Sequence, residues 1–182
     1  MRIITGKFRG KQIRPPANLP VRPTTDFAKE SLFDILNNLV DFEGLRVLDL
    51  FAGTGSISYE FFSRGGSLVT AIDRDPHCVT FINKTAESMK AENLEAVRED
   101  VLQFLKHPFG RYDLVFADPP YDMEGIDTLP DLVLTSDILY PAGFFILEHS
   151  RDHDFSEHPG FSQHRKYGNV NFSFFQDTDQ RA

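Results

Sequence analysis

The sequence predicts an α/β fold in which a mainly parallel β-sheet carries helices on both faces and ends in an antiparallel hairpin. Short apolar runs alternate with segments whose apolar residues recur at helical spacing, which is typical of parallel strands joined by crossover helices. The last two apolar runs, residues 161–166 and 170–176, are separated only by a short turn around Gly168 and Asn169, which favours a hairpin. Sheets of this kind bind ligands at the carboxyl ends of their strands.

The elements follow one another in a regular order. A basic arm or short β-hairpin, residues 1–23, precedes a domain of residues 24–182 whose first helix has N-cap groups at Thr24, Thr25 and Asp26 and ends at about Gly44. Strands are then expected at residues 45–50, 68–73, 96–99, 112–117 and 143–148, and helices at 56–64, 102–106 and 129–136, with a further helix whose buried face is Val79, Ile82, Ala86 and Met89.

The composition is that of a folded domain in a reducing compartment. The 182 residues are 41% hydrophobic and 25% charged, and the single cysteine excludes an internal disulfide and a cysteine-based zinc site. No stretch approaches the roughly 20 apolar residues of a membrane helix. We therefore expect a cytoplasmic monomer with no membrane contact and no metal, in which His149 and His153 are loop residues.

A glycine-rich turn after the first parallel strand is the first candidate binding site. Asp49 leads into Phe51-Ala52-Gly53-Thr54-Gly55, where glycines permit a tight turn and a close approach to a ligand. Asp73 ends the second strand, where an acid can accept hydrogen bonds from ribose hydroxyls. After the third strand, Asp100 can accept from an adenine amino group while Val101 donates a backbone N–H. These positions together predict a nucleoside cofactor.

S-adenosylmethionine fits these positions better than a dinucleotide or a nucleoside triphosphate. A NAD site calls for a third glycine three residues after Gly55, where Ser58 stands, and the loop has no Walker lysine. S-adenosylmethionine carries a ribose and an adenine without phosphates, and its amino-acid end suits Asp49. The predicted cofactor set is Thr25, Asp49, Phe51, Ala52, Gly53, Thr54, Gly55, Asp73, Arg74, Asp100, Val101 and Asp118.

Asp118-Pro119-Pro120-Tyr121 follows the apolar strand at residues 112–117 and is the predicted catalytic motif. An exocyclic amino group of a nucleobase is a weak nucleophile because its lone pair is conjugated with the ring. The Asp118 carboxylate and the Pro119 carbonyl can each accept one N–H of that group, while the prolines fix φ and remove competing donors. Tyr121 is expected to stack on the base. The motif predicts an amino group as acceptor without choosing between guanine and adenine.

The N-terminal arm carries a charge opposite to that of the rest of the chain. Residues 1–30 contain seven basic and two acidic side chains, a net charge of +5, although the whole chain has a net charge of −8. Such an excess favours contact with phosphates, and an alternative function is a non-catalytic module that docks on RNA through this arm. The candidate RNA contacts are Arg2, Lys7, Arg9, Lys11, Arg14 and Arg22.

Taken together, these motifs resemble the class I methyltransferases that modify amino groups and have a Rossmann-like fold. The chain is more closely similar to the bacterial 16S rRNA guanine-N2 methyltransferase family, through residues 2–4, 6–11, 22–26 and 29–33 beside the two strand-end motifs. The resemblance implies transfer of a methyl group from S-adenosylmethionine to N2 of a guanine in 16S ribosomal RNA, within an assembled or assembling small subunit. It also implies that residues 22–26 lie near the methionine end of the cofactor. Adenine-N6 methylation of DNA or RNA is the alternative.

Overall fold

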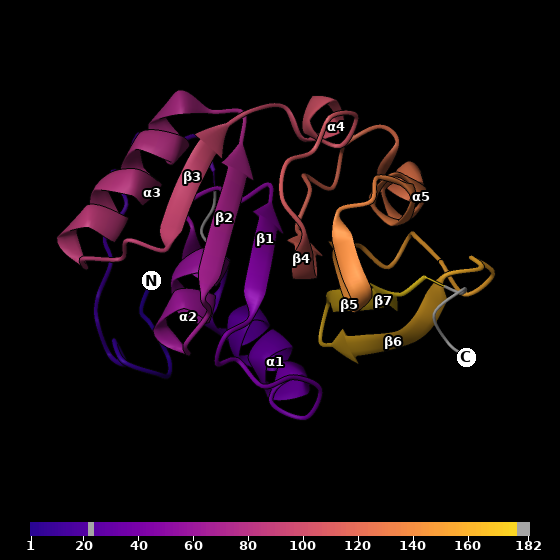
Figure 1. Ribbon diagram of the computed structural model, residues 1–182, viewed down its shortest axis with the longest axis horizontal. Helices are drawn as coiled ribbons and strands as arrows, with labels where there is room; N and C mark the ends of the chain where they lie inside the picture. Colours follow the sequence, from indigo (N-terminus) through magenta and orange to yellow (C-terminus); the bar gives the residue numbers. More distant parts are fainter. Residues whose placement is uncertain (22–23, 178–182) are drawn as a thin grey trace.

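The computed structural model describes residues 1–21 and 24–177 as a seven-stranded sheet with helices on both faces (Figure 1). The elements are α1 (Asp26–Leu36), β1 (Arg46–Leu50), α2 (Ser56–Ser63), β2 (Leu68–Asp73), α3 (Pro76–Ser88), β3 (Leu94–Arg98), α4 (Val101–Phe104), β4 (Tyr112–Ala117), η1 (Ile126–Thr128), α5 (Leu129–Thr135), β5 (Leu139–His149), β6 (Phe161–Tyr167) and β7 (Val170–Phe175).

The strand order is β3-β2-β1-β4-β5-β7-β6, and the first five strands of the chain pair in parallel. The hairpin β6-β7 pairs antiparallel within itself and with β5, so the predicted fold class is confirmed. The order reverses between β1 and β4, where Leu50 lies opposite Ala117. The carboxyl ends of β1 to β5 form one edge of the sheet, the carboxyl edge, and the switch point lies at this edge. The arrowheads of β1, β2 and β3 point toward it in Figure 1.

Alternate side chains of the strands build two separate hydrophobic cores. Val47 and Leu114 belong to the core beneath α1, α2 and α3, whereas their chain neighbours Leu48 and Val115 belong to the core beneath α4 and α5. The alternation follows from the two-residue period of a β-strand. The face on which a side chain at the end of a strand lies is therefore the face of the buried residue two positions before it.

The hairpin places β6 at the outer edge of the sheet. Phe172 and Phe174 of β7 enter the core beneath α1, whereas Phe175 enters the core beneath α5. By contrast, the outer strand exposes a polar and basic sequence, His164-Arg165-Lys166. The hairpin turn follows Tyr167 and lies beside the carboxyl end of β5, because Asn171 pairs with His149.

Several sequence-based boundaries are wrong, among them the start of β5, which lies at Leu139 rather than at residue 143. Helix α1 ends at Leu36 rather than at about Gly44, and residues 37–39 form a turn that leaves Leu39 48% exposed. The two asparagines explain the early end, since the side chain of Asn38 donates to the Asp34 carbonyl. His149 is not a loop residue but the buried last residue of β5, and its ring bonds the Ser173 hydroxyl at 2.8 Å.

The N-terminal arm folds back on itself and lies along α2. An isolated antiparallel bridge joins Arg2 to Gln12, and the side chains of Ile3 and Ile13 are buried in the core beneath α1. The arm is therefore packed on the domain rather than extended from it. Its turn lies at the C-terminal end of α2, where the backbone N–H of Lys7 donates to the Ser63 carbonyl at 2.7 Å.

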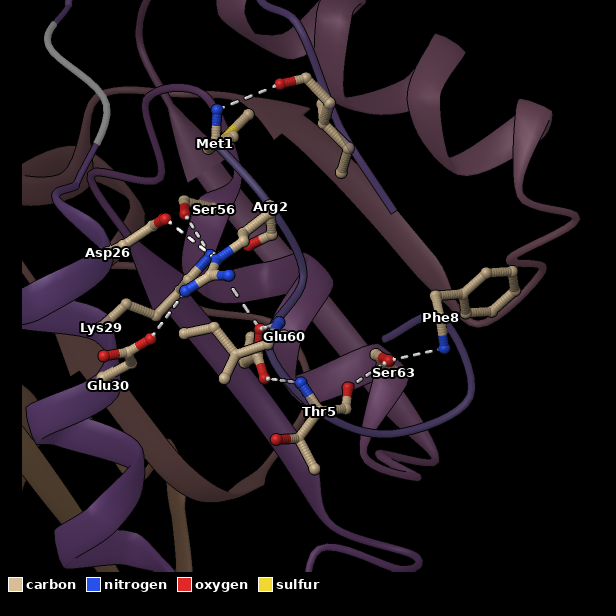
Figure 2. Close-up of polar contacts among 12 residues, drawn as sticks. Met1, Arg2, Thr5, Phe8, Asp26, Lys29, Glu30, Ser56, Glu60 and Ser63 are labelled. Carbon is tan, nitrogen blue, oxygen red and sulfur yellow. Dashed lines mark hydrogen bonds and ion pairs between the residues drawn. The ribbon is translucent and has the colours of Figure 1, made fainter. Parts of the chain in front are cut away.

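The carboxyl group of Glu60 on α2 holds the arm in place (Figure 2). It is fully buried and accepts the backbone N–H groups of Ile4 and Thr5 at 2.8 and 3.0 Å. Arg64 donates its Nε to the same carboxylate at 2.9 Å, and the Lys29 ammonium lies 3.9 Å away. The carboxylate thus accepts hydrogen bonds from the arm and from the end of α2, and it forms an ion pair with Lys29 of α1.

Lys29 connects α1 to the start of α2 and to the arm. Its ammonium donates to the Arg2 carbonyl at 2.5 Å and to the Ser56 hydroxyl at 3.1 Å, as Figure 2 shows. Burial lowers the pKa of Lys29, and the negative charge of Glu60 opposes that shift. Since Ser56 follows the glycine-rich turn directly, the lysine ties the arm to the element that leads out of the predicted cofactor loop.

We expect Glu60→Gln to lower the free energy of unfolding by about 3 kcal/mol, because it removes the negative charge beside two buried cations and replaces one acceptor oxygen with an amide donor. Glu30→Gln is the matched control. It removes only an exposed carboxylate that pairs with Arg2 at 3.2 Å and should cost less than about 1 kcal/mol. Urea unfolding of the three proteins measures both effects, and equal losses from the two variants would contradict the assignment.

Candidate active site

Four carboxyl groups converge on the carboxyl edge. Asp49 lies in β1, Asp73 ends β2, Asp118 follows β4 and Glu148 lies in β5. Asp49, Asp73 and Glu148 alternate with residues that face α4 and α5, so they point to the face covered by α1, α2 and α3. The first three of these acids were predicted from the sequence, and the fourth was not.

The glycine-rich turn between β1 and α2 has the tight geometry that the sequence predicts. Gly53 and Gly55 have φ values of +55° and +79°, and a Cβ on Gly55 would lie 2.8 Å from Ile82 and 2.9 Å from the Tyr59 ring. Phe51 also adopts a positive φ of 61°, which is strained for a side chain of its size. Packing from α2 and α3 therefore requires glycine at position 55.

Asp73 fixes the conformation of this turn from the neighbouring strand. Its carboxylate accepts the backbone N–H of Gly53 at 2.8 Å and that of Asp75 at 2.8 Å. A carboxylate has about four lone-pair positions, so both oxygens keep the capacity to accept a ribose hydroxyl. Thr54 is buried in the same turn, and its hydroxyl contacts the Met1 sulfur at 3.5 Å.

Asp49 is the most enclosed of the four acids. It is 2% exposed, and the Ser58 hydroxyl donates to it at 2.5 Å from the first turns of α2. Burial raises the pKa of Asp49 to about 7, and the charges of Asp118 and Asp73 add to that shift. A cationic group beside Asp49 would stabilise its ionised form.

The remaining predicted cofactor residues lie around the same edge. Asp100 caps α4 by accepting the backbone N–H of Leu102 at 3.0 Å through one carboxylate oxygen, and Val101 is buried as the first residue of that helix. Arg74 is exposed after β2. Thr25 caps α1 by accepting the backbone N–H of Ala28 at 3.1 Å.

The Asp118-Pro119-Pro120-Tyr121 motif lies directly beyond β4, beside the switch point. Asp118 is half-buried, and burial raises its pKa to about 7. Pro119 is buried and Pro120 is exposed. The Tyr121 side chain projects from the edge with 56% of its surface exposed. The motif thus presents an acceptor and an aromatic ring at the position where the strand order reverses.

Glu148 is the residue that the sequence analysis missed. It is 5% exposed, and the Tyr121 hydroxyl lies close enough to favour the charged form of its carboxylate. Burial raises the pKa of Glu148 to about 8, and the charge of Asp118 adds to the shift. The available signal was an acid near the end of an apolar strand, the pattern that identified Asp73.

The predicted RNA contacts fall into separate groups. Lys7, Arg9 and Lys11 are exposed at the turn of the arm, at the end of α2 away from the glycine-rich turn, and Arg14 is exposed further along the arm. Arg2 pairs with Asp26 and Glu30 at 3.2 Å each, as Figure 2 shows. Arg22 lies outside the described residues.

Two further properties concern only residues 1–21 and 24–177. No helix in these ranges is long and apolar enough to cross a membrane. The same residues contain no group of three or more His, Cys, Asp or Glu side chains suited to hold a metal ion.

Comparison with known proteins identifies the class and the family. Residues 1–176 match the model of a family described as conserved hypothetical protein 95. The ribosomal RNA small subunit methyltransferase D of Haemophilus influenzae is 31% identical over 156 residues, which are 84% of this chain and 80% of that protein. A candidate rRNA methyltransferase of Bacillus subtilis is 31% identical over 164 residues, 88% of each chain. A candidate methyltransferase from Escherichia coli matches in structure with a TM-score of 0.84, at 27% identity over 97% of both chains.

The fold and these matches define a class I methyltransferase with a Rossmann-like sheet, an enzyme that requires a methyl donor. The chain belongs to the family described as conserved hypothetical protein 95, together with the relatives named ribosomal RNA small subunit methyltransferase D. The family resemblance and the fold predicted from the sequence are therefore confirmed.

The raised pKa values of Asp49, Asp118 and Glu148 make the protein less stable as the pH rises through the neutral range. The folded state retains protons that the unfolded state has already released near pH 4, so stability falls as the pH passes the folded values of about 7, 7 and 8. We expect a lower melting temperature at pH 8.5 than at pH 6.5.

Glu148→Gln should reduce this pH dependence, because the amide does not ionise. Melting curves of the wild type and the variant at constant ionic strength measure the difference. Identical pH dependences in the two proteins would contradict the raised pKa of Glu148.

Proposed function

We propose that this chain transfers a methyl group from S-adenosylmethionine to the exocyclic N2 amino group of a guanine in small-subunit ribosomal RNA. The observation that carries the proposal is the position of Asp118 and Tyr121 at the switch point, beside the glycine-rich turn and Asp49. The names of the Haemophilus and Bacillus relatives support ribosomal RNA as the substrate class.

The residues of the carboxyl edge fit S-adenosylmethionine. Asp49 offers a buried carboxylate to the amino group of the methionine moiety, and Asp73 keeps lone pairs for the ribose hydroxyls. Asp100 uses one oxygen to cap α4 and has the second for the adenine amino group, next to the backbone N–H of Val101. When bound, the cofactor supplies an electrophilic methyl group on a sulfonium.

Asp118 and Pro119 prepare the nucleophile. Their carboxylate and carbonyl oxygens accept the two N–H bonds of the amino group and so direct its lone pair away from the ring. A carboxylate removed from water is a stronger acceptor than one in solution, and a fixed geometry needs no rearrangement during the reaction. The same carboxylate is placed to accept the proton that the nitrogen loses. The exposed Tyr121 ring provides the stacking surface for the base.

We expect Asp118→Asn to reduce methyl transfer roughly 100-fold while S-adenosylmethionine still binds, because the amide is a weaker acceptor and cannot take the proton. Asp122→Asn, an exposed acid four residues further along the chain, is the matched control and should retain activity. The assay measures labelled methyl transfer to small subunits from cells lacking the enzyme. Full activity of the Asp118 variant would overturn the mechanism.

The identity of the methylated nucleoside separates the proposal from the adenine alternative. RNA digestion after the assay, followed by mass spectrometry, should yield N2-methylguanosine. Recovery of N6-methyladenosine would instead establish adenine as the acceptor.

The substrate that we propose is the RNA within an assembled or assembling subunit, with the cytoplasmic enzyme acting as a monomer. Outside residues 1–30 the chain has a net charge of −13, which opposes contact with RNA over most of its surface. The arm turn supplies a local positive face through Lys7, Arg9 and Lys11. The RNA would then contact the enzyme at both ends of α2, which are about 12 Å apart for eight residues of helix.

Replacing Lys7, Arg9 and Lys11 with alanine should raise the KM for the subunit about tenfold and weaken its salt dependence, without changing the affinity for S-adenosylmethionine. The control is a triple variant of exposed lysines elsewhere, Lys84→Ala, Lys90→Ala and Lys106→Ala. KM values for the subunit at several salt concentrations test the arm. Equal changes in both triple variants would show that net charge, rather than the arm, determines binding.

A further inference from the structure

Glu148 lies near the end of β5, beside Asp118, which directly follows the neighbouring strand β4. Ala117 of β4 is paired with Leu147 of β5, so the next residue of each chain continues in the same register. Adjacent strands are about 4.8 Å apart. In keeping with this register, the charge of Asp118 raises the pKa of Glu148, and the Tyr121 hydroxyl favours the charged form of Glu148.

The environment of Glu148 differs from that of a carboxyl group buried for stability. Glu60 is equally enclosed, but it is paired with Arg64 and Lys29. Among the described residues no basic side chain forms an ion pair with Glu148, and a second acid stands beside it. Such surroundings disfavour the charged form of a buried carboxyl group, so its ionisation above neutral pH destabilises the fold. Its position is explained if a ligand supplies the missing donor.

We propose that Glu148 determines the choice of base by accepting the ring N1–H of guanine while Asp118 holds the adjacent N2 amino group. This inference rests on the proposed function and extends it to recognition. In guanine, the amino group to be methylated lies next to a ring N–H donor. In adenine, the amino group lies next to a ring nitrogen that only accepts. An ionised carboxylate only accepts hydrogen bonds, so it pairs with the first arrangement and repels the second.

Tyr121 orients the recognising carboxylate. Its hydroxyl lies beside Glu148 and favours the charged form of that carboxylate, while the side chain is exposed at the edge where the base would stack. Tyr121 therefore connects the surface on which the base would stack to the Glu148 carboxylate that would accept the N1–H of guanine. The N1–H of guanine adds a second donor to the carboxylate and further stabilises its ionised form, whereas adenine would require the carboxyl group to keep its proton.

The test uses 2-aminopurine, which has the 2-amino group of guanine but lacks the N1–H. Small subunits are reconstituted from ligated RNA that carries either guanosine or 2-aminopurine riboside at the position mapped with the wild-type enzyme. The quantity measured is the ratio of kcat/KM for the two bases, at about pH 8.5. We expect the wild type to prefer guanine at least tenfold.

Glu148→Gln should reduce this preference about tenfold or more, because its amide can donate to the unprotonated N1 of 2-aminopurine. Glu148→Asp keeps an acceptor and should retain the preference at a lower rate. Glu124 is an exposed acid three residues after Tyr121. Glu124→Gln is therefore the matched control and should resemble the wild type. Unchanged affinity for S-adenosylmethionine shows that the variants retain the folded site.

The outcomes separate the two levels of the proposal. If the wild type produces N2-methylguanosine and Glu148→Gln keeps the wild-type base ratio, the role of Glu148 is overturned and the proposed function stands. If the wild type methylates adenine instead, both are overturned. A base ratio that falls in Glu148→Gln but not in Glu148→Asp or Glu124→Gln supports the assignment.

Discussion

The buried carboxylate of Glu60, with its three hydrogen bonds and its ion pair to Lys29, is the interaction on which the arrangement of the N-terminal half depends. It joins the backbone of the arm to α2 and, through Lys29, to α1. Helix α2 in turn supplies Ser58 to Asp49, and its packing determines which residue fits at Gly55. The geometry of the glycine-rich turn is thus set by contacts that lie outside it.

The acids removed from solvent are of two kinds, those paired with cations and those grouped at the carboxyl edge. Glu60 is surrounded by donors and cations, so its charge contributes to the folded state. Asp49, Asp118 and Glu148 share one edge, where burial raises the pKa of each, and the charge of Asp118 raises the pKa of Asp49 and Glu148 further. Ligands that bring hydrogen-bond donors or positive charge would stabilise the ionised forms of these acids.

The sequence predicted most of the fold and much of the site, because both depend on local patterns. Apolar runs located the strands, and motifs that follow a strand directly, such as Gly53 to Gly55 and Asp118 to Tyr121, inherit their position from it. The features that escaped depend on neighbours distant in the chain. Glu148 lies beside Asp118 because β5 pairs with β4. Arg2 pairs with Asp26 because the arm packs against α1. The early end of α1 reflects the hydrogen bond from the Asn38 side chain to the Asp34 carbonyl, which the spacing of apolar residues does not predict.

The outer strand β6 has a consequence for the protein in a crowded solution. An edge strand presents unpaired backbone N–H and C=O groups, which are a template for a strand of another molecule. Here the edge is occupied by the exposed sequence His164-Arg165-Lys166. Two copies that approached along this edge would bring like charges together and leave them partly desolvated. The basic edge therefore protects the sheet from growing by strand addition, and it keeps the hairpin that closes the fold from becoming a site of aggregation.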